Sequence, residues 1–172
     1  DKPICISLSS DWHLSPRGPV DLGGLRAYAE AIRDTPGAFA VCVGDLHQNP
    51  VRHEISIPDV ADEIKLVDYA LGIFGMKMLA VVGGNHDYRT YQQSGLDHLR
   101  WLADREKVYY APDELSLILE IVDPRNTGET TARYHIALRH QYRRHSFLNP
   151  LHACWRYLEE RVGEWPLGLD GG

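Results

Sequence analysis

The chain of 172 residues carries a formal net charge of −6, which argues against a broad basic surface for a nucleic-acid backbone. It holds no apolar run long enough to cross a membrane, and it does not open on a basic segment followed by an apolar stretch, so neither a membrane partner nor a secretory signal peptide is expected. Its 3 cysteines lack metal-ligand spacing and fit buried thiols in a reducing compartment, which predicts a cytoplasmic protein.

The first part of the chain alternates apolar strands with amphipathic helices, a pattern that predicts an α/β fold in a single domain over residues 1–172. In chain order, the pattern predicts a strand over 4–8, a helix from Leu22 through Ile32, a strand over 39–43, a helix that begins at Pro58 and carries apolar residues as far as Phe74, a strand over 78–82, and a helix carrying Leu96, Leu99 and Leu102.

Strands predominate in the next part of the chain. They are predicted at 108–110, 115–122 and 134–138, and the turn residues from Asp123 to Gly128 separate the last two. This arrangement predicts a hairpin that either joins a mixed sheet or forms a second sheet packed on the first. A final helix is predicted from about Pro150, before a glycine-rich tail over 163–172.

Each of the first three predicted strands is followed by a polar cluster. The clusters are Asp11-Trp12-His13, Gly44-Asp45-Leu46-His47 and Gly83-Gly84-Asn85-His86-Asp87. In an open α/β sheet, ligands bind at the carboxyl ends of the strands, so these three loops are expected to meet at one edge. One such cluster alone is common turn chemistry, but three in this order are hard to obtain by chance.

The clusters supply carboxylate, imidazole and amide ligands, which suit Mn, Fe, Zn or Mg. Asp11 and His13 are expected to hold one divalent metal ion, and Asn85 offers a neutral oxygen to a second. Asp45 has two carboxylate oxygens and is expected to bridge the two ions, at a separation of about 3.5–4 Å. The sequence therefore predicts a centre with two metal ions.

In these runs the sequence resembles the calcineurin-like metallophosphoesterase family, over roughly residues 4–145. The matching runs are Asp11-x-His13, Gly44-Asp45 and Gly84-Asn85-His86-Asp87. The resemblance implies a β-sandwich of mixed sheets flanked by helices, two divalent metal ions with Mn favoured, and hydrolysis of a phosphodiester or phosphomonoester by a metal-bridged water. It also implies that His86 stabilises charge at the scissile phosphate or protonates the leaving oxygen, and that Asp87 orients His86.

The family places a further histidine after a later strand, as a ligand of the second ion. His140 is the best match because it directly follows the predicted strand over 134–138, and His145 and His152 are reserve candidates. Arg139 and Arg143 lie beside His140 and are expected to hold phosphate oxygens of the substrate, unless this run is a basic surface stretch.

The sequence departs from the family at its end, because no Gly-His-x-His run supplies a final histidine to each ion. Truncation at the C-terminus is expected, rather than a site completed in another way. Two alternatives stay open: a metal-dependent nuclease acting on DNA or RNA, and a non-catalytic member with a degenerate site. His47 bears on the first, because a similar histidine lines the site of the family's DNA-repair nucleases; it is either a substrate-binding residue or a plain loop residue.

Overall fold

The computed structural model describes residues 3–18, 20–49, 57–122, 125, 130–140, 156–157 and 160. The chain divides into two compact units, residues 1–140 and 141–172, where the sequence alone predicts one domain. Of the second unit only Arg156, Tyr157 and Glu160 are described, and all three are helical. The rest of the predicted final helix and the tail over 163–172 lie outside the described residues. No described helix has the length and apolar character that a membrane crossing requires.

The first unit is built on a four-stranded parallel sheet. Its strands are β1 (Cys5–Ser9), β2 (Ala38–Val43), β3 (Met78–Val82) and β4 (Tyr109–Ala111), in the spatial order β1-β2-β3-β4. The register pairs Cys5 with Ala38 and Val43 with Val82. Because all four strands run in the same direction, their carboxyl ends lie along one edge of the sheet.

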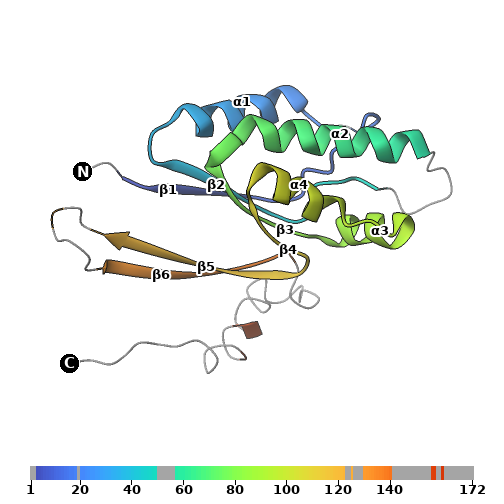
Figure 1. Cartoon of the computed structure of the whole chain (residues 1–172). Helices are drawn as coiled ribbons and strands as arrows, with labels where there is room; N and C mark the ends of the chain where they lie inside the picture. The colour runs from blue at the N-terminus through green and yellow to red at the C-terminus, as the bar shows by residue number, and fades with distance from the viewer. Residues whose placement is uncertain are drawn as a thin grey trace, which may run out of the picture. The chain divides into compact units, whose positions relative to one another are not determined.

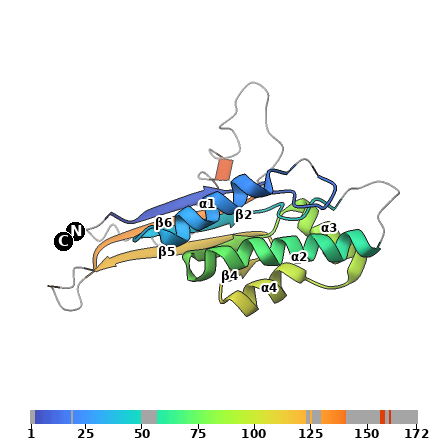
Figure 2. The ribbon, with the colours of Figure 1, turned by 90° about the horizontal axis from the view of Figure 1, so that it is seen from above.

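Helices connect the strands, and α1, α2 and α4 cover one face of the sheet (Figures 1 and 2). The helical elements are α1 (Leu22–Asp34), α2 (Ile57–Phe74), the short 3₁₀ helix η1 (Gly75–Lys77), α3 (Asn85–Ser94) and α4 (His98–Glu106). Asp21 caps α1, because its side chain accepts a hydrogen bond from the N–H of Gly24 at 2.9 Å. Ala29, Phe74 and Leu102 from the helices pack against Cys42 of β2 in the core on this face.

A hairpin packs against the opposite face. Its strands, β5 (Glu114–Val122) and β6 (Thr130–Arg139), form a separate antiparallel sheet in which Leu117 pairs with Ile136. Leu138 of β6 is buried in a second core with Val41 of β2 and Val82 of β3. The two central strands, β2 and β3, are thus covered on both faces, which explains why their sequences are nearly continuous apolar runs. The predicted α/β class and the hairpin that forms a second sheet are confirmed.

The segment after β3 differs from the sequence prediction, which has one helix carrying Leu96, Leu99 and Leu102. The structure has two helices, and Leu96 lies exposed between them. Gly95 takes a left-handed conformation, with φ of 70°, that ends α3, and the side chain of Asp97 accepts a hydrogen bond from the N–H of Arg100 that begins α4. The sequence of α3 carries no apolar stripe, so its periodicity gave no sign of a helix.

The cysteines depart in part from the expectation of buried thiols. Cys42 is buried in β2, and burial raises the pKa of its thiol. Cys5 is exposed on β1, which pairs only with β2 among the described strands. Cys154 lies outside the described residues. An edge strand leaves part of its side chains in solvent, and a short apolar run does not reveal which strand will take that position.

Candidate metal centre

The loops after β1 and β2 run side by side at the carboxyl edge of the sheet. The N–H groups of Asp11, His13 and Leu14 donate hydrogen bonds to the carbonyl oxygens of the loop after β2, at 2.8–3.0 Å. Asp11, His13 and Asp45 all hold left-handed backbone conformations, with φ of 56°, 45° and 53°. Such conformations are strained for residues with a Cβ and persist where the surrounding structure enforces them. The local backbone is therefore shaped to bring these side chains together.

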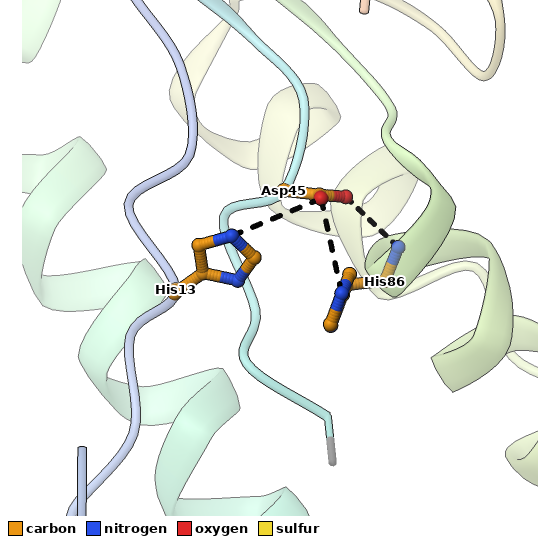
Figure 3. A group of neighbouring side chains, drawn as sticks. All are labelled: His13, Asp45 and His86. Carbon is orange, nitrogen blue, oxygen red and sulfur yellow. Dashed lines mark hydrogen bonds and ion pairs between the residues drawn. The ribbon is translucent and has the colours of Figure 1, made fainter. Parts of the chain in front are cut away.

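Five of the predicted site residues converge here. Two groups of side chains each offer ligand atoms that all lie within 4.8 Å of one another: His13, Asp45 and His86 form the first, and Asp11, Asp45 and His140 form the second. Asp45 belongs to both groups and is buried, with 4% of its surface exposed. Figure 3 shows the first group, with Asp45 between the two imidazole rings. The convergence places a loop after β1, the turns after β2 and β3, and the end of β6 around one carboxylate.

One oxygen of Asp45 is surrounded by imidazole nitrogens. Its Oδ2 lies 3.2 Å from Nε2 of His140, 3.9 Å from Nε2 of His13 and 4.0 Å from Nε2 of His86. Its Oδ1 accepts a hydrogen bond from the N–H of His86 at 2.8 Å, which holds the carboxylate in place. Nε2 of His13 also lies 3.7 Å from Oδ1 of Asp11.

The hydrogen bonds of two histidines fit a cation ligand. Nδ1 of His140 lies 2.7 Å from the carbonyl oxygen of Val43, and Nδ1 of His86 is bonded to the carbonyl oxygen of Gln48. Because a carbonyl oxygen only accepts, each Nδ1 carries a proton and donates it, which leaves Nε2 with its lone pair in the neutral ring. A histidine that donates from one nitrogen to a backbone carbonyl is oriented to bind a metal with the other.

His13 turns Nε2 toward Asp11 and Asp45, but its other ring nitrogen differs from those of His86 and His140. Its Nδ1 is buried and has no hydrogen-bond partner among the described residues. Carboxylate oxygens and imidazole nitrogens at these separations are the ligands that Zn, Mn and Fe take in proteins. A cation would also relieve the crowding of lone pairs around Oδ2 of Asp45. The residues of this chain therefore suit a metal ion in each group.

Two glycines make room for this arrangement. A Cβ at Gly84 would collide with the carboxylate and the backbone nitrogen of Asp45, and a Cβ at Gly44 would collide with the ring of His140. Gly44 also has a positive φ of 83°, which favours glycine. The glycine at position 44 in one turn and at position 84 in the other thus follows from the close approach of ligand side chains to the backbone.

Asp87 has a different role from the predicted one of orienting His86. Its Oδ1 accepts hydrogen bonds from the N–H of His47 at 3.0 Å and from the ring Nδ1 of His47 at 2.8 Å. Its Oδ2 accepts from the N–H groups of Gly84 at 2.9 Å and Leu46 at 3.3 Å. Burial alone would raise the pKa of Asp87, but the hydrogen bonds from His47 and Gly84 outweigh it and hold the pKa below its usual value. Asp87 therefore ties the turn after β3 to the turn after β2.

His47 is correspondingly buried, with 1% of its surface exposed. Its ring pairs with Asp87, and its role in substrate binding stays a prediction. The ring of His86 contacts Arg89 instead of Asp87, with Nη1 of Arg89 at 3.2 Å from Nε2 of His86. Sequence reasoning missed Arg89, whose place one helical turn after His86 becomes visible only once α3 is recognised.

The remaining predicted residues lie outside the two groups. Asn85 is the first residue of α3 and is exposed, and its role as a ligand stays a prediction. Arg139 is paired with two carboxylates, Glu114 at 2.8 Å and Asp113 at 2.9 Å, and its role in holding a phosphate stays a prediction. The remaining candidates, Arg143, His145 and His152, lie outside the described residues.

Comparison with known proteins adds no relative to this picture: no family model matches the chain, and no curated protein matches it.

Proposed function

We propose that this chain is a metal-dependent phosphoesterase that hydrolyses a phosphodiester or a phosphomonoester. The observation that carries the proposal is the pair of side-chain groups that share the buried carboxylate of Asp45, with a histidine and a second ligand in each. A shared carboxylate between two groups is the arrangement expected of a centre with two divalent cations. The resemblance in Asp11-x-His13, Gly44-Asp45 and Gly84-Asn85-His86-Asp87 supports the same reaction class.

Two divalent cations, when bound, would neutralise charge on the phosphate oxygens and lower the pKa of an attacking water. The chain's own residues orient the site around them. Val43 and Gln48 fix the rings of His140 and His86 through their carbonyl oxygens. Arg89 places a permanent positive charge beside His86, where it would attract a phosphate oxygen. In the state in which Nε2 of His86 also carries a proton, His86 would pass that proton to the leaving oxygen instead of binding a cation.

The experiment that tests the proposal is removal of the shared carboxylate. Asp45→Asn is expected to abolish the hydrolysis of bis(p-nitrophenyl) phosphate in the presence of Mn²⁺ and to release both cations, measured by elemental analysis after dialysis. Asp104→Asn is the matched control, because Asp104 is exposed on α4 and belongs to neither side-chain group. A wild-type chain that bound no divalent cation and hydrolysed no phosphoester would refute the proposal and favour a non-catalytic domain.

A further inference from the structure

A second concave site lies beside the candidate centre, at the carboxyl ends of β3 and β4. It is a pocket of about 380 Å³ whose wall includes Gly83 and Pro112, which follow these two strands. Gly84, the next residue along the turn, lies against the carboxylate of Asp45. The pocket and the candidate centre are therefore neighbours on one edge of the sheet, and the turn from Gly83 to Asp87 lines both.

The wall of this pocket is rich in aromatic rings. Tyr88 and Tyr91 project from α3 with their ring centroids 6.0 Å apart, and they stay 55% and 46% exposed. Tyr110 of β4 also lines the pocket and is only partly exposed. The guanidinium of Arg100 lies over the Tyr110 ring, 5.8 Å from its centroid. Exposed tyrosines and a stacked arginine offer flat surfaces on which another planar ring can stack.

Three residues that line the pocket, Tyr110, Asp97 and Arg100, are held in place by hydrogen bonds to one another. The hydroxyl of Tyr110 donates to the carboxylate of Asp97, at 3.0 Å and 3.1 Å from its two oxygens. Asp97 also accepts from the N–H of Arg100 at 3.1 Å. Burial and the nearby Asp97 raise the pKa of Tyr110, so the hydroxyl keeps its proton and the hydrogen bond at neutral pH. The aromatic wall is thus built before any molecule binds.

We propose that this pocket binds the base of a nucleotide, by stacking on Tyr88, Tyr91 and the Arg100–Tyr110 pair. The position of the phosphate rests on the proposed function, which places it at the adjoining centre. A nucleotide combines a planar ring with a phosphoester, the two groups for which the two neighbouring sites are suited. The net charge of −6 favours a mononucleotide over a strand, whose repeated phosphates the protein would repel.

The test measures the binding affinity of the full chain and not its turnover. A chelator is present so that no metal ion contributes to binding. Adenosine 5′-monophosphate (AMP) and ribose 5-phosphate are titrated in parallel by isothermal calorimetry, because they differ only in the base. AMP is expected to bind between about five- and a hundredfold more tightly. Tyr88→Leu combined with Tyr91→Leu should remove most of that preference, whereas Tyr88→Phe with Tyr91→Phe should keep it, since the rings remain.

Tyr69→Leu is the matched control, because Tyr69 is equally exposed but lies on α2, away from the pocket. A strand of four deoxyadenylate nucleotides is titrated as a third ligand. If it bound more tightly than AMP and the double leucine variant lost that binding, the result would support the base pocket and show that the preferred base belongs to a strand. Equal affinity for AMP and ribose 5-phosphate, or a preference that survives the double leucine variant, would overturn the inference. Neither result depends on metal or hydrolysis, so failure of the pocket and failure of the proposed function are distinguished.

Discussion

At the scale of single residues, the candidate centre depends on how the histidines are oriented. His140 and His86 both donate from Nδ1 to a backbone carbonyl and direct Nε2 toward Asp45. They differ in their other contacts, because within the described part of the chain only His86 has an arginine beside its Nε2, at 3.2 Å. A metal ligand and a proton donor can therefore be told apart by replacing each in turn.

His86→Gln is expected to keep both cations, because His13, Asp45, Asp11 and His140 still supply ligands, and to lower turnover by about 10²–10⁴-fold, the usual contribution of a general acid. His140→Gln is expected to lose one cation per chain, because it removes the ligand closest to Asp45. Elemental analysis and steady-state rates with a model phosphodiester measure both effects, and His135→Gln on β6 is the control. Loss of a cation in the His86 variant would make His86 a ligand and leave the proton donor unassigned.

Gly84 gives a purely steric test of the same centre. Its φ lies in the extended region at −112°, so alanine is not strained there, but the added Cβ would push the carboxylate of Asp45 away. Gly84→Ala is expected to cost about 1–3 kcal/mol of stability, as overpacking does, and to weaken cation binding by tenfold or more. Gly72→Ala is the matched control, because nothing lies within 4 Å of a Cβ there. Urea unfolding should show a lower stability, and a cation titration a weaker affinity, for Gly84→Ala than for Gly72→Ala. Equal stability and equal affinity would contradict the placement of Asp45.

At the scale of elements, the turns after β2 and β3 are joined through one buried carboxylate. Asp87 accepts hydrogen bonds from both turns and pairs with a ring that is 1% exposed. A buried charge of this kind holds its partners in one arrangement, because an unpaired donor in the interior is costly. The geometry of the site thus depends on a residue that touches neither cation group.

Asp87→Ala is expected to lower the free energy of unfolding by about 3–5 kcal/mol, since it leaves His47 and three N–H groups without an acceptor. Asp87→Asn keeps an acceptor oxygen and should cost less, about 1–3 kcal/mol. Chemical unfolding followed by circular dichroism measures both, with Asp104→Asn as the exposed control. An alanine variant as stable as wild type would show that the turns are held together by other contacts.

Sequence reasoning reached the strands and the convergence of Asp11 and Asp45, because apolar runs mark strands and parallel strands place the residues that follow them at one edge. His140 was chosen only through the family resemblance, since it follows β6 of the antiparallel hairpin. It did not reach the partner of Asp87, which depends on how two turns fold against each other. It also did not reach the pairing of Arg139 with Glu114, which the hairpin register places opposite each other. Contacts set by the register or by turn geometry are not encoded in residue spacing.

At the scale of the whole first unit, the hairpin and the parallel sheet meet at the centre. Leu138 of β6 is 4% exposed in the core between the two sheets, and His140 lies two residues farther along the chain. Packing of the hairpin therefore determines where His140 sits. A cation held by His140 and by the parallel-sheet loops should in turn stabilise the docked hairpin, since binding to the folded state raises its stability.

Leu138→Ala is expected to destabilise the chain by about 2–5 kcal/mol, as a cavity in a core does, and to weaken cation binding through the displacement of His140. Ile118→Ala is the matched control on the same hairpin, because Ile118 is 53% exposed. Thermal unfolding with and without Mn²⁺ measures both effects. If Mn²⁺ stabilised the Leu138 variant as strongly as wild type, the hairpin would not contribute to cation binding.

Three of the residues at the centre, Asp11, His13 and Asp45, hold left-handed backbone conformations, and His13 also buries a nitrogen for which the described residues offer no partner. Each feature lowers the free energy of unfolding of the metal-free chain. Glycine, which adopts positive φ freely, would lower this energy at any of the three positions while removing a ligand. Chains selected only for survival at high temperature should therefore drift toward glycine at these positions and lose the centre, whereas selection for turnover should keep all three.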